Sequence, residues 1–218
     1  DFNPEARTVR VEAGVVLDQL NAFVAGHGLS FGPDVATSSR ATFGGMIANN
    51  SSGARAPLYG TTIDHVLSVE AALTDGRIVE LGVDREGMHE HLEDIDALIQ
   101  SHAPEIRERF HEGIVKRWPG YALDRYLRAP RDLSKLMVGS EGTLASILSA
   151  TIRLVPLPKS KGIGLVFFDT LEAAMEATVE LLDMHPAGIE HIDDVLFNQT
   201  RGQLAFKAAR DLLELDAK

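Results

Sequence analysis

The sequence predicts an α+β fold in which helices flank a mixed or antiparallel sheet of about four to five strands. Three observations lead to this prediction. Residues 8–13 alternate between polar and apolar side chains, as a strand with one buried face does. Residues 67–81 contain two β-prone runs joined by Thr74-Asp75-Gly76-Arg77, and an Asp-Gly pair in that position favours a β-hairpin. Residues 89–110 are charged and carry apolar side chains at helical spacing.

The first half of the chain divides at glycines. Gly14 ends the predicted strand 8–13, and residues 16–27 follow as a helix with Gly28 near its C-terminal cap. Residues 31–60 have almost no helical or strand periodicity, which predicts a long loop. The next predicted strand covers residues 62–73, and its hairpin returns along residues 78–81.

The region from residue 85 to residue 131 changes character and is predicted to be a helical insertion. Within it, Pro104 is expected to start a new helix that reaches residue 116, since proline is favoured in a first helical turn. Residues 150–155 then form the last strand of this part, ended by Pro156.

A domain boundary is expected next to Pro158, giving one domain over residues 1–158 and another over residues 159–218. The second part is predicted to contain strand 164–168, helix 171–184 with Thr170 as its N-cap, and strand 189–192. Residues 194–215 are predicted to be helical with a break at Gly202, so this part has a β-α-β start.

Composition excludes several classes of function. The net charge of −11 over 218 residues argues against a nucleic-acid partner, which needs basic surfaces to neutralise phosphate. Cysteine is absent, so this chain has no disulfide, thiolate nucleophile, cysteinyl flavin link or iron–sulfur cluster. The sequence shows neither a signal peptide nor an apolar run long enough to cross a membrane. We expect a cytoplasmic location, and peripheral membrane association of a longer parent is left open.

The segment 31–60 is the strongest candidate for a binding site. Its glycines let the backbone approach a ligand closely, and its hydroxyl groups supply hydrogen bonds that suit phosphate or ribityl oxygens. It matches neither the Walker nor the Rossmann pattern. Phe43, Met46 and Ile47 are interleaved, so the segment is expected to pack on the core. Composition leaves two interpretations open: a cradle for a long phosphate-bearing ligand, or an ordered Ω-loop with structural glycines.

Several short motifs resemble a known family. Pro33-Asp34, Thr42-x-Gly44-Gly45, Asn50-Ser51-Ser52-Gly53 and Tyr59-Gly60 together resemble the FAD-binding segment of the vanillyl-alcohol-oxidase family. A second block, Gly139-Ser140-Glu141-Gly142-Thr143-Leu144, is similar to that family's GSEGTLGI signature, although Ala145-Ser146 replaces Gly-Ile. Within the family, the resemblance is to FAD-linked D-lactate, glycolate and D-2-hydroxyglutarate dehydrogenases. It implies a PCMH-type FAD-binding subdomain with a helical insertion and the start of an α+β cap domain.

The resemblance also implies FAD as the cofactor and two groups of cofactor-binding residues. The first group is Pro33, Thr42, Gly44, Gly45, Asn50, Ser52, Gly53, Tyr59 and Gly60, and the second is Glu141 and Gly142. The amides of Gly44 and Gly45 would approach the phosphates or the ribityl chain. Glu141 and Gly142 have a structural alternative, in which Glu141 caps a turn and Gly142 needs positive φ. No catalytic residue and no metal ligand is assigned, because the family's substrate and metal residues would lie beyond Lys218.

Two more residues of this region allow contrasting interpretations. Arg55 either pairs with a carboxylate or phosphate, or is a solvated loop charge, and the sequence does not decide between them. His65 lies in strand-forming sequence, where a structural histidine with satisfied hydrogen bonds is the better expectation.

The resemblance implies oxidation of a small D-2-hydroxy acid by hydride transfer to flavin N5. The electron acceptor is unknown, and an iron–sulfur domain or subunit outside this chain is one candidate. The family places another FAD-binding subdomain before the first strand, so we expect the chain to be a fragment with little or no activity alone. The alternative function is a catalytically silent nucleotide-binding or regulatory module, such as a flavin-less paired subunit.

Overall fold

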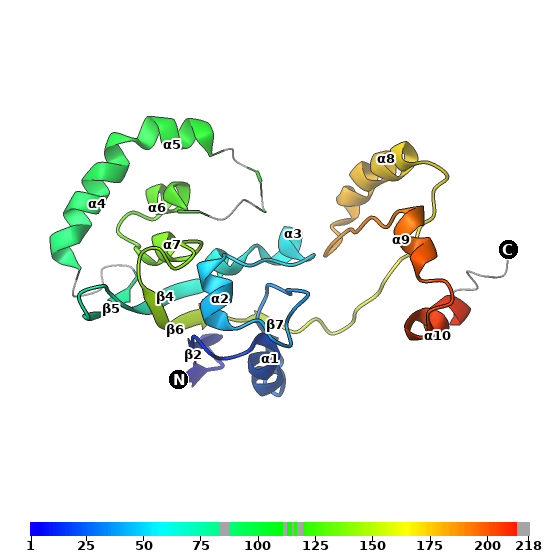
Figure 1. Ribbon diagram of the computed structural model, residues 1–218, viewed down its shortest axis with the longest axis horizontal. Helices are drawn as coiled ribbons and strands as arrows, with labels where there is room; N and C mark the ends of the chain where they lie inside the picture. The colour runs from blue at the N-terminus through cyan, green and yellow to red at the C-terminus, as the bar shows by residue number, and fades with distance from the viewer. Residues whose placement is uncertain (83–87, 111–112, 115, 117–119, 213–218) are drawn as a thin grey trace. The chain divides into compact units, whose positions relative to one another are not determined.

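The computed structural model describes residues 1–82, 88–110, 113–114, 116 and 120–212 (Figure 1). The chain divides into two compact units, Asp1–Gly164 and Leu165–Lys218. Each unit is described by itself. Within the described residues, no helix combines the length and apolarity needed to cross a membrane.

The first unit is built on a five-stranded antiparallel sheet with the order β1-β2-β6-β4-β5. Its strands are β1 (Phe2–Asn3), β2 (Thr8–Glu12), β4 (Val66–Ala72), β5 (Ile78–Leu81) and β6 (Ser146–Arg153). Ala150 lies opposite both Val11 and Val69, so β6 joins the N-terminal strands to the β4–β5 hairpin. The predicted α+β fold with an antiparallel sheet is confirmed.

The two faces of the sheet differ in chemistry because side chains alternate along each strand. Val9, Val11 and Val69 are buried on one face. On the other face, Arg10 pairs with Glu70 at 3.2 Å and with Glu80 at 3.1 Å.

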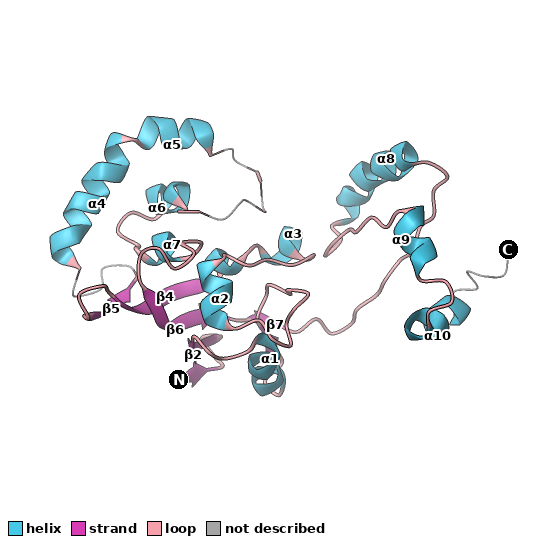
Figure 2. Cartoon of the chain, viewed as in Figure 1, coloured by secondary structure: helices cyan, strands magenta, loops and turns pink. Residues whose placement is uncertain are grey.

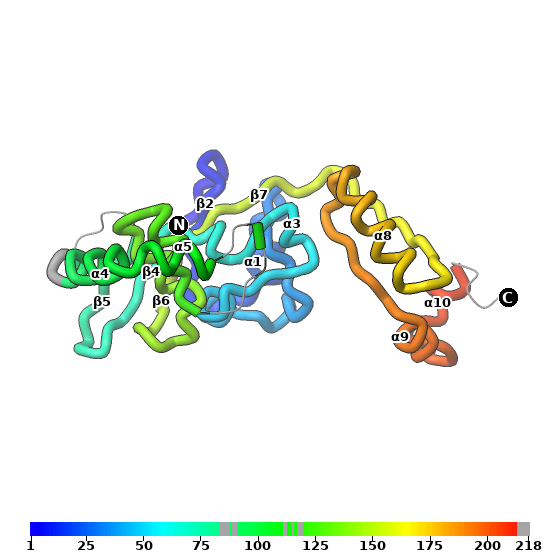
Figure 3. Tube along the Cα trace, turned by 90° about the horizontal axis from the view of Figure 1, so that it is seen from above, coloured from blue at the N-terminus to red at the C-terminus, as the bar shows by residue number. Residues whose placement is uncertain are grey.

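Helices pack on the sheet and on one another in successive layers. Helices α2 (Phe43–Ala48) and α7 (Ser134–Met137) pack on the strands, and α6 (Leu123–Arg128) packs on α7. Figure 2 shows α6 and α7 above β4 and β6, with α2 beside these strands. Helices α4 (His89–Ser101) and α5 (Ala103–Arg109) contact α6 and form the outermost layer. Seen from above, α4 and α5 follow one another, and α4 lies at the end of the sheet where β5 is (Figure 3).

The described part of the predicted insertion is helical, as expected. Pro104 lies in the first turn of α5, which confirms the predicted helix start. Helix α5 ends at Arg109, short of the predicted residue 116, and part of the stretch between them lies outside the described residues.

Several boundaries in the first unit were predicted wrongly. Segment 31–60 is not a loop throughout, because it contains α2 and α3 (Ala56–Tyr59). Phe43, Met46 and Ile47 are all buried, so their i, i+3, i+4 spacing is a short helical face. Strand β6 begins at Ser146 rather than at residue 150, because its serine-containing start still pairs with the end of β4.

A small second sheet lies beside the main one. Helix α1 (Leu17–Ala25) leads to β3 (Leu29–Ser30), which pairs with β7 (Val155–Pro156). The predicted strand 62–73 also begins differently, since Thr62–Asp64 forms a 3₁₀ turn before β4 starts at Val66.

The second unit contains α8 (Leu171–Leu181), a 3₁₀ turn, α9 (Asp194–Gln199) and α10 (Leu204–Leu212). The Thr170 hydroxyl accepts a hydrogen bond from the Ala173 amide at 3.2 Å, which confirms the predicted N-cap. Gly202, with φ of 72°, separates α9 from α10 as predicted. The strands expected at residues 164–168 and 189–192 are wrong, because a strand needs a paired neighbour and the described part of this unit offers none.

Candidate functional site

Helix α2 is the centre of the candidate site. The apolar side chains of Phe43, Met46 and Ile47 hold it against the core, each at most 2% exposed. Six of the predicted cofactor-binding residues lie within this short helix or just beside its ends, namely Thr42, Gly44, Gly45, Asn50, Ser52 and Gly53. Burial of one face therefore fixes the position of a polar, glycine-rich backbone.

The second predicted block meets the C-terminal end of this helix. The Gly139 amide donates to the Ile47 carbonyl at 2.9 Å, and the Glu141 amide donates to the Ala48 carbonyl at 2.9 Å. Carbonyl groups at a helix end lack partners within the helix, so these two bonds satisfy them. The fold thus brings together the two motif blocks that lie far apart in the sequence.

Glu141 and Gly142 are exposed at this junction and both adopt positive φ, at 52° and 74°. The structural alternative for Gly142 is therefore correct as to its backbone conformation. Glu141 is the more informative residue, because a left-handed conformation is unfavourable for a side chain with a Cβ and is often retained at functional positions. Whether either residue contacts FAD stays a prediction.

The paired glycines have different surroundings. The Gly44 amide donates to the Ala13 carbonyl at 2.8 Å, and a Cβ at this position would lie 2.9 Å from the Ala13 Cβ. The Gly44 amide is therefore engaged in a hydrogen bond, and its lack of a side chain allows close packing against Ala13. Gly45 is exposed, and a Cβ there would meet only the Thr42 hydroxyl at 3.4 Å. Of the two amides expected to face the cofactor, that of Gly45 is the one with open space beside it.

Asn50 also serves the fold. It adopts a left-handed conformation with φ of 50°, and its side-chain oxygen accepts a hydrogen bond from the Ile63 amide at 2.9 Å. This bond joins the end of α2 to the 3₁₀ turn Thr62–Asp64 that precedes β4. The carboxamide oxygen is thus occupied, while the side chain remains half-buried.

Gly53 lies against Asp34. A Cβ on Gly53 would overlap the carbonyl and carboxylate oxygens of Asp34. The Asp34 carboxylate also pairs with the Arg55 guanidinium at 3.1 Å, which decides between the two interpretations of Arg55 in favour of a paired charge. Asp34 was not selected from the sequence as a site residue, although it adjoins Pro33, which is buried.

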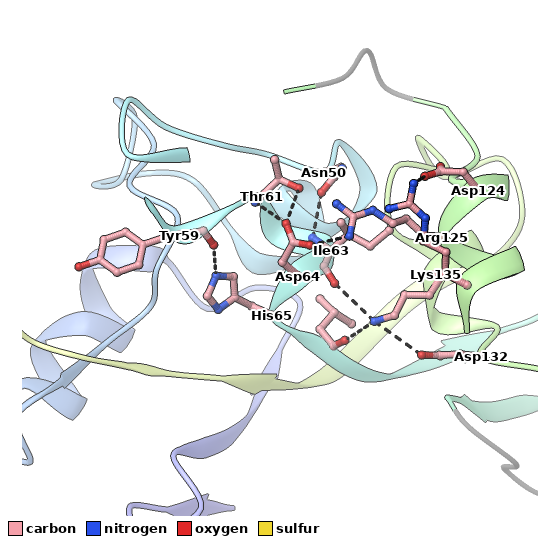
Figure 4. Close-up of polar contacts among 12 residues, drawn as sticks. Asn50, Tyr59, Thr61, Ile63, Asp64, His65, Asp124, Arg125, Asp132 and Lys135 are labelled. Carbon is pink, nitrogen blue, oxygen red and sulfur yellow. Dashed lines mark hydrogen bonds and ion pairs between the residues drawn. The ribbon is translucent and has the colours of Figure 1, made fainter. Parts of the chain in front are cut away.

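The turn at Tyr59 and Gly60 is held from below by His65. The His65 Nε2 atom lies 2.8 Å from the Tyr59 carbonyl oxygen, and the ring is buried with 5% exposure (Figure 4). His65 therefore is a structural histidine, as the sequence predicted. Gly60 has φ of 74°, and a Cβ there would overlap the Asp64 carboxylate.

A wider polar network fixes the same turn and was not foreseen. Asp64 accepts from the Thr61 amide at 2.8 Å and pairs with Arg125 of α6 at 3.0 Å. Lys135 of α7 donates to the Val66 carbonyl at 2.9 Å and pairs with Asp132 at 3.6 Å (Figure 4). Asp64 is far from Arg125 in the sequence, and Lys135 is far from Val66, so no local spacing predicts these two contacts.

Several polar groups around α2 have no hydrogen bond within the described part of the chain. They are the hydroxyl groups of Thr42, Ser52 and Ser140 and the exposed Gly45 amide. The Ser140 oxygen is buried, and buried groups without a partner are uncommon unless a bound group or water satisfies them. Hydroxyl and amide donors suit the phosphate and ribityl oxygens of FAD, so the residues present fit that cofactor.

Other candidate sites are weaker. A cavity of 460 Å³ lies between β2 and α1, and none of the predicted cofactor-binding residues lines it. Within the described residues, His, Asp and Glu side chains form no group of three that could hold a metal ion.

Comparison with known proteins agrees with this geometry. Residues 1–82 match the FAD binding domain family. D-2-hydroxyglutarate dehydrogenase of Pantoea ananatis is 33% identical over 227 residues, which cover 98% of this chain and 22% of that protein. D-lactate dehydrogenase of Archaeoglobus fulgidus is 37% identical over 194 residues, which cover 88% of this chain and 35% of that protein. Glycolate oxidase subunit GlcD of Bacillus subtilis is 29% identical over 196 residues, covering 88% of this chain and 33% of that protein.

The chain thus spans between about a fifth and a third of the length of these relatives. The matched FAD binding domain includes the first motif block, and the names of the relatives agree with the resemblance stated above. Residues 1–82 therefore match an FAD binding domain, and most of the chain is similar to parts of these dehydrogenases and of the glycolate oxidase subunit.

Proposed function

We propose that this chain is part of the FAD-binding domain of a flavin-dependent enzyme that oxidises a small D-2-hydroxy acid. The observation that supports this best is the junction at α2, where amides of Gly139 and Glu141 bind the carbonyls of Ile47 and Ala48. This junction gathers the predicted FAD contacts at one helix. The names of the relatives support the class of substrate, since they include D-2-hydroxyglutarate dehydrogenase and D-lactate dehydrogenase.

The role of these residues is to bind and orient the cofactor rather than to transfer protons. Bound FAD would supply the hydride acceptor, because redox chemistry of this kind belongs to the cofactor. The Gly45 amide and the hydroxyls of Thr42 and Ser52 would donate to its oxygens. His65 and Asn50 would hold the surrounding turns, since their polar atoms already bind the backbone at Tyr59 and Ile63.

The residues of this chain do not supply an iron–sulfur electron acceptor. Cysteine is absent from the chain, so an iron–sulfur centre that accepts electrons would belong to another domain or subunit. The substrate carboxylate would likewise be recognised by residues outside the α2 junction.

The test is flavin binding, measured by visible absorbance and by fluorescence titration with FAD. It is run on this chain and on the longest natural protein that contains it. We expect the longer protein to bind FAD and to reduce a dye acceptor with D-2-hydroxyglutarate or D-lactate. Absence of FAD binding in both proteins would favour the silent regulatory module instead.

A pair of adjacent serines provides a matched control. The Ser52 hydroxyl has no partner among the described residues, whereas the Ser51 hydroxyl accepts from the Asn49 side chain at 3.1 Å. Ser52→Ala should weaken FAD binding by about tenfold, the loss of one well-placed hydrogen bond. Ser51→Ala should leave FAD affinity close to that of the unmodified protein. Equal affinities for the two variants would remove Ser52 from the site.

A further inference from the structure

Asp34 makes three contacts that close the segment between residues 35 and 54 into a loop. Its Oδ1 atom accepts from the Arg55 amide at 3.2 Å, and its Oδ2 atom pairs with Arg55 Nε at 3.1 Å. Gly53 packs directly against the Asp34 backbone and carboxylate, with no room for a Cβ. We name this set of contacts among Asp34, Gly53 and Arg55 the Asp34 clasp.

The clasp includes one predicted cofactor-binding residue, Gly53, and encloses several others. Thr42, Gly45, Asn50 and Ser52 all lie within the closed segment. The carboxylate and guanidinium are both about one-third exposed, and ion pairs of that kind add little to global stability. Its contribution is therefore expected to be local, in the ordering of the segment that it closes.

We propose that Asp34 is a positioning residue for FAD, acting through Arg55 and Gly53 to hold the loop in its binding conformation before the cofactor arrives. This inference rests on the proposed function. The physical reason is preorganisation, because a loop that must be ordered on binding spends part of the interaction energy on its own ordering. Asp34 itself need not touch FAD, since both carboxylate oxygens are engaged by Arg55.

The chain contains a control with the same chemistry. Asp75 accepts from the Arg77 amide at 3.0 Å through Oδ1 and pairs with Arg77 Nε at 2.7 Å through Oδ2. This second clasp spans two residues in a hairpin turn, whereas the Asp34 clasp spans 21. Removing either carboxylate deletes the same two bonds, but only the Asp34 clasp closes the candidate FAD loop.

The experiment compares Asp34→Ala, Asp34→Asn and Asp75→Ala in the natural protein that contains the whole chain. FAD affinity is measured by fluorescence titration, and hydrogen exchange over residues 35–54 is measured without FAD. We expect Asp34→Ala to weaken FAD binding by about tenfold and to speed exchange across the loop. Asp34→Asn keeps an acceptor for the Arg55 amide and should recover part of the affinity. Asp75→Ala should change neither measurement.

The outcomes separate this inference from the proposed function. If the unmodified protein binds no FAD, the proposed function fails and this inference falls with it. If the unmodified protein binds FAD and Asp34→Ala binds it equally well, the inference is wrong while the proposed function stands.

A variant of Arg55 supplies the test if Asp34→Ala does not fold. Arg55→Ala is used, because it removes the ion pair and keeps the backbone bond to Asp34. That variant should weaken FAD binding by a few fold. Unchanged FAD affinity in Arg55→Ala together with unchanged loop exchange would also overturn the inference.

Discussion

The two adjacent glycines of α2 should respond in opposite ways to alanine. An alanine Cβ at position 44 would lie 2.9 Å from the Ala13 Cβ and 3.2 Å from the Ala13 carbonyl oxygen. Both contacts are closer than ordinary packing and involve parts of the chain that cannot rotate away. At position 45, the nearest atom would be the Thr42 hydroxyl at 3.4 Å, which is ordinary van der Waals contact.

The expected magnitudes follow from two competing terms. Alanine in place of glycine within a helix favours folding by up to about 1 kcal/mol. Overpacking against a fixed neighbour costs about 1 to 3 kcal/mol. Gly44→Ala should therefore lower the free energy of unfolding by up to about 2 kcal/mol, whereas Gly45→Ala should raise it by as much as about 1 kcal/mol.

For Gly45→Ala, the expected change in FAD affinity is opposite in direction to the expected change in stability. Gly45→Ala places a methyl group beside the amide proposed to face the cofactor, so we expect FAD binding to weaken by about tenfold although the protein becomes more stable. Urea unfolding without FAD and fluorescence titration with FAD supply the two measurements. Equal stabilities for the two variants would refute the packing argument at Ala13. Undiminished FAD affinity in Gly45→Ala would refute the role of Gly45.

Three further predictions concern the residues that support this site. His65→Gln should preserve a donor to the Tyr59 carbonyl. His65→Asn should lower the free energy of unfolding by about 1 to 3 kcal/mol, because it leaves that buried carbonyl unpaired. Equal thermal stability of the two variants would contradict this. Lys135→Met should lower the free energy of unfolding, measured with urea, by about 1 to 3 kcal/mol because the Val66 carbonyl loses its donor. Lys207→Met, at an exposed ion pair, should change that free energy by less than about 1 kcal/mol. Similar losses in both variants would contradict the prediction. Burial, with a smaller contribution from the Asp96 charge, raises the pKa of Tyr126, so its contribution to stability is complete below its ordinary pKa of about 10 and is lost as pH rises above that value. Tyr126→Phe should accordingly flatten the alkaline fall in stability measured by urea unfolding between about pH 9 and about pH 11, and an unchanged slope would show that another group titrates there.

Local patterns in the sequence were sufficient where structure depends on neighbours along the chain. The Asp75-Gly76 pair predicted the β4–β5 hairpin, and the threonine before α8 predicted its N-cap. These features depend on backbone conformations and hydrogen bonds between residues a few positions apart. The residues that form them can therefore be recognised directly in the sequence.

Prediction was less successful where a partner strand or a short helix was needed. Residues 164–168 and 189–192 have β-prone composition but no strand to pair with in the described part of their unit. Conversely, α2 was missed because a six-residue helix offers fewer than two turns of periodicity, and its glycines suggested a loop. Burial of Phe43, Met46 and Ile47 stabilises that helix despite its glycines.

The sequence by itself determined the α+β class, the resemblance to FAD-linked oxidases and dehydrogenases, and the two blocks from which the candidate site is built. Tertiary structure alone decided how those blocks meet, through amides at Gly139 and Glu141 that bind the end of α2. It also decided that Gly44 packs on Ala13 while Gly45 stays open, and that Arg55 pairs with Asp34. The physical reason is that a residue's type fixes which bonds it can make, whereas its partner is fixed only when the folded chain brings distant backbone and charged groups within hydrogen-bonding distance.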